Sequence, residues 1–163
     1  MRKLVTAGLI GMCTLAAQGE YVQINMTVFG MDCPPCAYAI RSSMRGIRGV
    51  EAVNVDLNTG LVSVKLTTGN NVEMRQFNDA VEKNGFVHQS SDVWVRGTVS
   101  GSAQAPFLDV TGTRDRYALA PLASGMDLSR LIGKAVLVEG IVPQSARGKV
   151  ADVLRYKTVA EAR

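Results

Sequence analysis

The sequence is poor in the side chains that usually carry catalysis or bind soft metal ions. Its 163 residues include only three cysteines and one histidine, His88. We find no glycine-rich phosphate loop, no serine, histidine and aspartate set, and no zinc motif with a nearby general base. Hydrophobic residues make up 47% and charged residues 20%, which is ordinary for a globular protein and excludes a disordered one. We therefore expect a folded binding protein and not an enzyme.

The first nineteen residues differ in character from the rest of the chain. Arg2 and Lys3 precede an apolar run over 4–17, and residues 17–19 place small side chains at the spacing that signal peptidase requires. The run is shorter than the roughly 20 residues of a membrane-spanning helix. We interpret 1–19 as a cleaved signal peptide, which predicts a periplasmic or secreted protein that is not integral to the membrane after cleavage. An uncleaved anchor and lipid attachment at Cys13 are the alternatives.

Removal of this leader changes both the charge and the cysteine count. The net charge falls from +4 to +2 when Arg2 and Lys3 are lost, so nucleic acid is not an expected partner. Only Cys33 and Cys36 then remain, and one pair is too few for a disulfide scaffold. The purpose of these two cysteines should therefore be chemical.

Residues 20–91 predict a β-α-β-β-α-β order, which is the ferredoxin-like arrangement. Alternating apolar residues predict strands, and apolar residues three and four positions apart predict helices. The expected strands lie over 22–28, 53–57, 61–66 and from 86, and the helices begin near 35 and 72. Asn71 is the expected N-cap of the second helix, with Met74 standing where a capping box requires glutamate or glutamine.

Residues 92–163 predict short strands and suggest a small OB-like β-barrel domain. The expected strands are 93–99, 107–111, 117–119, 135–142 and 150–159, with one helical stretch over 128–132 capped by Asp127. The cluster Arg114 to Arg116 is expected to be a solvated turn, and Phe107 and Tyr117 are candidate aromatic platforms. By analogy with this fold, we expect a surface that docks a membrane metal transporter or another exported protein.

The segment Gly30-Met31-Asp32-Cys33-Pro34-Pro35-Cys36 carries the strongest chemical signal. Two cysteines separated by two residues can direct both sulfurs at one centre, at about 2.3 Å for zinc, and can hold copper(I) or mercury(II) in two-coordinate fashion. The start of a helix lowers the pKa of a thiol, and the thiolate is the form that binds metal. We therefore predict a metal site here.

This motif, placed between a first strand and a first helix, resembles that of heavy-metal-associated domains. Members include copper chaperones, modules of metal-pumping ATPases and periplasmic mercury-binding proteins, and the resemblance covers residues 22–90. It implies that Cys33 and Cys36 bind the metal. It also implies that Met31 packs beneath the loop and that Phe86 shields the site.

Two features depart from the commonest pattern of that family. Asp32 stands where most copper and mercury members have threonine or serine, and it resembles the variant of zinc, cadmium and lead exporters in which this aspartate is a third ligand. The expected ion is therefore heavy and thiophilic: zinc, cadmium, lead, copper(I) or mercury. The second departure is the pair Pro34 and Pro35, which stiffens the loop and removes two N–H donors.

A different function would use the same cysteine pair. In an oxidising compartment Cys33 and Cys36 could form a disulfide, and thiol-disulfide redox proteins have the same spacing at a helix start. Such domains usually carry an aromatic residue directly before the motif, where this chain has Asp32. His88 is expected to be a surface or half-buried polar residue and not a ligand.

Overall fold

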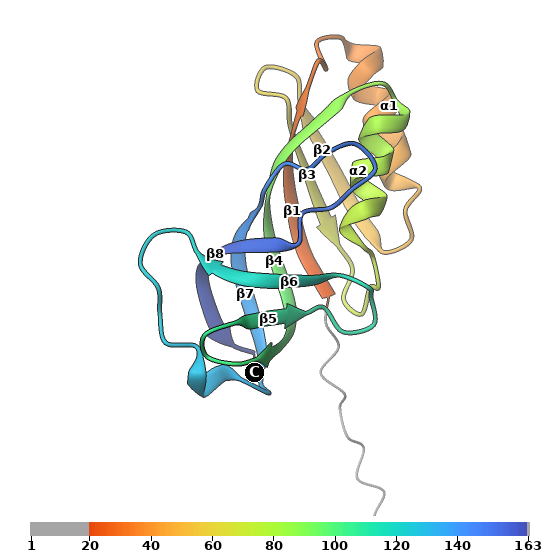
Figure 1. Cartoon of the computed structure of the whole chain (residues 1–163). Coiled ribbons are helices and arrows are strands. Elements are labelled where there is room, and N and C mark those ends of the chain that lie inside the picture. Colours follow the sequence, from red (N-terminus) through yellow and green to blue (C-terminus); the bar gives the residue numbers. More distant parts are fainter. Residues whose placement is uncertain (1–19, 163) are drawn as a thin grey trace, which may run out of the picture.

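Residues 20–162 are described by a computed structural model, and the expected signal peptide, including Cys13, lies outside them. The chain forms two units that share one long strand (Figure 1). Within the described residues, no helix combines the length and apolar character needed to cross a membrane. The elements are β1 (Glu20–Phe29), α1 (Pro34–Arg45), β2 (Val50–Asp56), β3 (Leu61–Leu66), α2 (Met74–Lys83), β4 (Val87–Gly101), β5 (Pro106–Asp109), β6 (Arg116–Pro121), η1 (Ser129–Leu131), β7 (Ala135–Val142) and β8 (Val153–Glu161).

The first unit is an antiparallel sheet with both helices packed on one face (Figure 1). Its strands lie in the order β2-β3-β1-β4, so β1 occupies the interior between β3 and β4. Alternate residues of β1 point into the core because side chains of a strand alternate between faces. The buried members on β1 are Ile24, Met26 and Val28, and α1 adds Ala37, Ile40 and Met44. This arrangement confirms the predicted ferredoxin-like unit.

The turn between β2 and β3 comes close to the end of β1. Gly60 has a φ of +70°, a conformation that favours glycine, and its carbonyl accepts a 2.8 Å hydrogen bond from the Val28 N–H. A Cβ added at Gly60 would lie 2.6 Å from the carbonyl oxygen of Val28. The predicted hairpin is therefore anchored two residues before the metal-binding segment begins.

Helix α2 starts two residues later than its expected cap implied. The N-cap is Glu73 and not Asn71, and the third helical residue is Gln76. The Gln76 side chain accepts a 2.9 Å hydrogen bond from the Glu73 N–H, as in a capping box. The expectation of an incomplete cap at Met74 was wrong, because the first helical residue is Met74 itself.

Strand β4 is one continuous strand where the sequence suggested two. The sequence predicted a boundary between residues 91 and 92, with separate strands from 86 and over 93–99, but β4 runs through this boundary from Val87 to Gly101. Residues 87–96 pair with β1, residues 91–98 pair with β7, and residues 98–101 pair with β5. Because β4 has partners on both edges over 91–96, it belongs to both units and ties them together.

The second unit is a closed five-stranded barrel. Its strands follow the order β4-β5-β6-β8-β7, and pairing of β7 with β4 closes the ring. β6 and β8 are parallel, and the other neighbours are antiparallel. The helical stretch expected over 128–132 is a single 3-10 turn, Ser129–Leu131. Asp127 still accepts a 2.9 Å hydrogen bond from the Ser129 N–H.

The two units meet at a buried polar cluster. The Tyr21 hydroxyl on β1 donates to Asp115 Oδ2 at 2.6 Å and lies 2.7 Å from the Tyr117 hydroxyl. The same carboxylate oxygen accepts a 2.7 Å hydrogen bond from the N–H of Met74, the first residue of α2. Burial raises the pKa of Asp115 and of both tyrosines.

These contacts correct two expectations for the second unit. In the cluster at 114–116 the two arginines are exposed as expected, but Asp115 is partly buried and Arg114 binds Glu73 on the other unit. Tyr117 is 1% exposed and cannot be a stacking platform. Phe107 is half-buried, with the Arg116 guanidinium 4.4 Å from the centre of its ring.

Candidate metal centre

The candidate site lies on the short loop that joins β1 to α1. Gly30 turns the chain after β1 with a φ of +88°, a region that side-chain-bearing residues rarely adopt. Met31 follows and is buried at 4% exposure, so it packs beneath the loop as an apolar anchor. Asp32 then returns the chain to the surface, directly before the first cysteine.

Cys33 forms the N-cap of α1, with its Sγ accepting a 3.2 Å hydrogen bond from the Cys36 N–H. Pro34 and Pro35 occupy the first two helical positions, where the missing N–H groups would have had no intrahelical partner. The next amide, of Ala37, donates to the Cys33 carbonyl at 3.1 Å. The Cys36 amide is therefore the one N–H of this first turn that bonds to sulfur.

The two cysteines are joined in a disulfide with their Cα atoms 5.1 Å apart. This is the oxidised state of the motif, which the sequence left open beside the thiolate pair that binds metal. The spacing of the two cysteines allows the motif to be either a dithiol or a disulfide, because one turn at a helix start brings the two side chains to disulfide distance. Both residues are half-buried, so the sulfurs are not sealed inside the core.

Asp32, Cys33 and Cys36 form a cluster of possible metal ligands. One carboxylate oxygen and both sulfurs all lie within 4.8 Å of one another. Over residues 20–162 this is the one group of three or more cysteine, histidine or acidic side chains close enough to share an ion. The mixture of soft sulfur and hard oxygen suits thiophilic ions such as zinc, while the sulfurs alone suit copper(I).

Phe86 lies next to the loop, where the family resemblance implied a shielding aromatic residue. Its ring is half-buried, and a Cβ added at Gly30 would lie 3.8 Å from Phe86 Cδ1. His88 lies two residues further along and is buried at 4% exposure, with Nε2 3.2 Å from Glu82 Oε1. The histidine is therefore not part of the ligand cluster, and its side chain contacts the Glu82 carboxylate and not the cysteine pair.

Sequence reasoning missed the contacts that the barrel makes with the first unit. Glu82 accepts hydrogen bonds from Gly148, and Asp115 accepts one from Met74, across long separations in the chain. No local pattern marks these residues, since each partner is fixed only by how the two units pack.

A ferredoxin-like unit with a cysteine pair at the head of its first helix defines a small metal-binding module of the thiolate type. Residues 25–86 match the model of the heavy-metal-associated domain. An uncharacterized protein of Haemophilus influenzae is 35% identical over 85 residues, which cover 51% of this chain and 90% of that protein. The copper chaperone CopZ of Staphylococcus aureus is 36% identical over 61 residues, which cover 37% of this chain and 88% of CopZ.

The chain belongs to the heavy-metal-associated domain family, and this membership supports heavy-metal binding as its class of function. Among solved structures, the N-terminal domain of ZntA in its apo form is 28% identical. The match covers 43% of this chain and 92% of that domain, with a TM-score of 0.38. The residues that match the family model lie within the first unit.

Proposed function

We propose that the reduced chain captures one thiophilic metal ion between Cys33 and Cys36 and passes it to a partner by ligand exchange. The observation that carries this proposal is the clustering of two sulfurs and one carboxylate oxygen within 4.8 Å on a loop that reaches the surface. A half-buried site is shielded enough to hold an ion and open enough for an incoming ligand. The metal is the cargo of the protein. Before the metal can bind, the disulfide must be reduced by two electrons to two thiols.

Asp32 sets the choice of ion in this proposal. Its carboxylate is exposed and adjacent to Cys33, so it is free to turn toward the bound ion as a third ligand. Zinc, cadmium and lead gain from such an oxygen, whereas copper(I) and mercury(II) are satisfied by two thiolates. We favour a divalent ion, with copper(I) as the next candidate, because the relative CopZ is named a copper chaperone.

The setting of the protein follows from the leader and the barrel. We propose that residues 1–19 are a signal peptide and that the mature chain acts in the periplasm or outside the cell. The barrel order β4-β5-β6-β8-β7, with its parallel pair, supports an OB-like unit. We propose that this unit presents the metal module to a membrane metal transporter or another exported protein.

One observation favours a second candidate function, which is thiol-disulfide exchange. Cys33 and Cys36 are disulfide-bonded, and Pro34 lies beside Cys33 at the exposed surface, where a thiolate of a partner could approach. In that role the pair would accept two electrons from a substrate dithiol and release an oxidised substrate. Metal binding would then be incidental.

Metal titration of the reduced protein tests the proposed function. We expect about one ion per chain, with thiolate-to-metal charge-transfer absorption, because one cysteine pair defines one centre. Cys33→Ser should abolish this binding while keeping the helix cap, because serine is a favoured N-cap residue. Asp79→Asn is the matched control, since Asp79 is a carboxylate on α2 that contacts Arg75 and not the cluster. Unchanged binding by the Cys33 variant would end the proposal.

Two measurements separate metal capture from the redox alternative. The first is the reduction potential of the cysteine pair, and the second is turnover with a dithiol or disulfide substrate. Turnover by the metal-free protein would support the redox function. A potential below about −300 mV without turnover would indicate an inert structural disulfide instead.

A further inference from the structure

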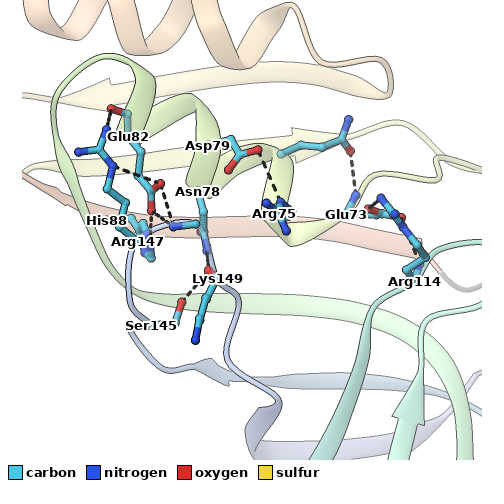
Figure 2. A network of polar contacts seen from close by, with 12 residues as sticks. Glu73, Arg75, Asn78, Asp79, Glu82, His88, Arg114, Ser145, Arg147 and Lys149 are labelled. Atoms are coloured by element: carbon cyan, nitrogen blue, oxygen red, sulfur yellow. Dashed lines mark hydrogen bonds and ion pairs between the residues drawn. The ribbon is translucent and has the colours of Figure 1, made fainter.

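Helix α2 is held at both ends by loops of the barrel. At its N-terminus, Arg114 binds the Glu73 carboxylate through Nε at 3.0 Å and Nη2 at 2.8 Å (Figure 2). Near its C-terminus, the segment between β7 and β8 crosses from the barrel and lies along the helix (Figure 1). The Asn78 amide donates to the Lys149 carbonyl at 3.1 Å in this second contact.

The second contact is built around the buried carboxylate of Glu82. Both of its oxygens accept from the Gly148 N–H, at 3.1 and 3.0 Å, and Oε1 lies 3.2 Å from His88 Nε2. The Glu82 side chain is 10% exposed and the His88 side chain 5% exposed. Arg147 adds a 3.4 Å hydrogen bond from Nη2 to the Glu82 carbonyl (Figure 2). The Gly148 N–H holds the carboxylate and Arg147 holds the backbone carbonyl, so the barrel segment contacts both the side chain and the main chain of Glu82.

Phe86 connects this contact to the metal loop. The chain leaves α2 through a tight turn in which Gly85 donates to the Glu82 carbonyl at 3.0 Å and Phe86 donates to the Val81 carbonyl at 3.2 Å. The Phe86 ring lies near Gly30 of the metal loop, since a Cβ added at Gly30 would lie 3.8 Å from Phe86 Cδ1. Phe86 also lines a small pocket together with Glu82, His88, Ser145 and Arg147. Phe86 is therefore near both the metal loop and residues of the barrel segment.

We propose that Glu82, held by the backbone of Gly148, is a positioning residue for the metal centre, so that the barrel controls how tightly Phe86 closes over Cys33 and Cys36. This inference rests on the proposed metal-binding function. The route is short: the barrel loop fixes Glu82, Glu82 fixes the turn at Gly85, and the turn fixes Phe86. The heavy-metal-associated unit alone contains no counterpart of this loop, because Gly148 and Arg147 belong to the barrel.

Glu82→Gln keeps the shape of the side chain and removes its charge. We expect metal release from the loaded protein to become faster by about threefold or more, because a neutral amide binds the Gly148 N–H of the barrel segment less firmly than the carboxylate does. Release is measured by transfer of the ion to an excess of a chromophoric chelator. The reduction potential of the Cys33–Cys36 pair should shift as well, since the same aromatic covers both states of the motif.

Arg114→Ala is the matched control, because it removes the contact of the barrel with the opposite end of the same helix. It should leave metal release and the reduction potential unchanged. Equal effects of the two variants would overturn the inference, since they would indicate a general loosening of α2. In the Phe86→Ala background, Glu82→Gln should have no further effect on release, and a persistent effect would also contradict the route through Phe86.

Arg147→Ala provides a second probe if Glu82→Gln folds poorly. Its side chain is 80% exposed, so its removal spares the core, yet it loses the contact with the Glu82 carbonyl. A smaller acceleration in the same direction supports the inference, and wild-type release contradicts it. If the wild-type protein binds no metal, the proposed function fails. The reduction potentials then still decide whether Glu82 positions Phe86.

Discussion

The hydroxyl groups of Tyr21 and Tyr117 lie 2.7 Å apart in the interior, where β1 of the ferredoxin-like unit meets β6 of the barrel. Both rings are at most 1% exposed. A polar pair in such a place is stable only when its groups are paired with one another or with a further acceptor, which here is Asp115. The two units therefore share a buried interior and are not independent domains joined by a linker.

Tyr117→Phe should destabilise both the ferredoxin-like unit and the barrel, and not the barrel alone. The change keeps the ring and removes the contacts of the hydroxyl with Tyr21 at 2.7 Å and with Asp115 at 3.5 Å, so we expect a loss of about 1 kcal/mol in the free energy of unfolding. Chemical denaturation followed by circular dichroism measures it. Tyr38→Phe is the control, because Tyr38 is 71% exposed and its hydroxyl should contribute less than about 0.5 kcal/mol. Equal losses in the two variants would contradict the shared interior.

The buried carboxyl of Asp115 predicts a pH dependence of stability. Burial raises its pKa above the ordinary value of 3.8, so the folded state holds this proton more tightly than the unfolded state does. The contribution of Asp115 to stability is therefore full below pH 3.8 and is lost as the pH rises through the folded pKa. Ionised Glu73 contributes with the opposite sign, because its hydrogen bond with Arg114 lowers its pKa.

Comparison with Asp115→Asn isolates this contribution from that of Glu73. The free energy of unfolding is measured by denaturant titration at a series of pH values from about 3.5 upward. The wild-type value minus the variant value should fall as the pH rises above 3.8 and then level off. A difference that rises over this range would mean that the Asp115 pKa is lowered and not raised by the fold.

Gly60→Ala should destabilise the protein more than Gly112→Ala. Both glycines have positive φ, at +70° and +81°, which costs an alanine about 1–2 kcal/mol. At Gly60 the new methyl group would also overlap the Val28 carbonyl oxygen at 2.6 Å, whereas nothing lies within 4 Å at Gly112. Thermal unfolding of both variants measures the difference. An equal shift in the midpoint temperature would show that the approach of the hairpin to β1 is not tight.

Much of the first unit could be predicted from its sequence because its signals are local. The alternation of Ile24, Met26 and Val28 marks a strand with one buried face, and the structure buries all three. The position of the cysteine pair at a helix start follows in the same way, because proline favours the first helical turn. The start of α2 was misplaced because Asn71 is the favoured type of N-cap residue, whereas the helix begins after Glu73 and is closed there by the capping box with Gln76.

The features that could not be predicted depend on packing between distant segments. Ser90 and Ser91 favour a turn, yet β4 passes through them because β1 and β7 supply partners on both edges. Asp115 is flanked by two arginines, a pattern typical of the surface, but its acceptor role depends on Tyr21 and Met74. The oxidation state of the cysteine pair depends on the redox conditions around the protein, so the spacing of the two cysteines does not predict it.

Asp32→Asn should change metal preference more than it changes capacity. If Asp32 supplies a third ligand, the affinity for zinc should fall by at least about tenfold. Mutation of a residue that only supports a metal ligand can already cause a loss of this size. The affinity for copper(I) should stay within error, because two thiolates satisfy this ion. Competition titrations with metal-specific chelators measure both. Equal losses for the two ions would assign Asp32 a general electrostatic role, and Asp79→Asn should affect neither.

The measurement that tests the central claim most directly is X-ray absorption at the zinc edge of the reduced, zinc-loaded protein. The account predicts two sulfur neighbours at about 2.3 Å, with oxygen completing the shell. Cys36→Ser should leave one sulfur. A first shell of oxygen and nitrogen alone in the wild-type protein would contradict the assignment of Cys33 and Cys36 as the metal ligands.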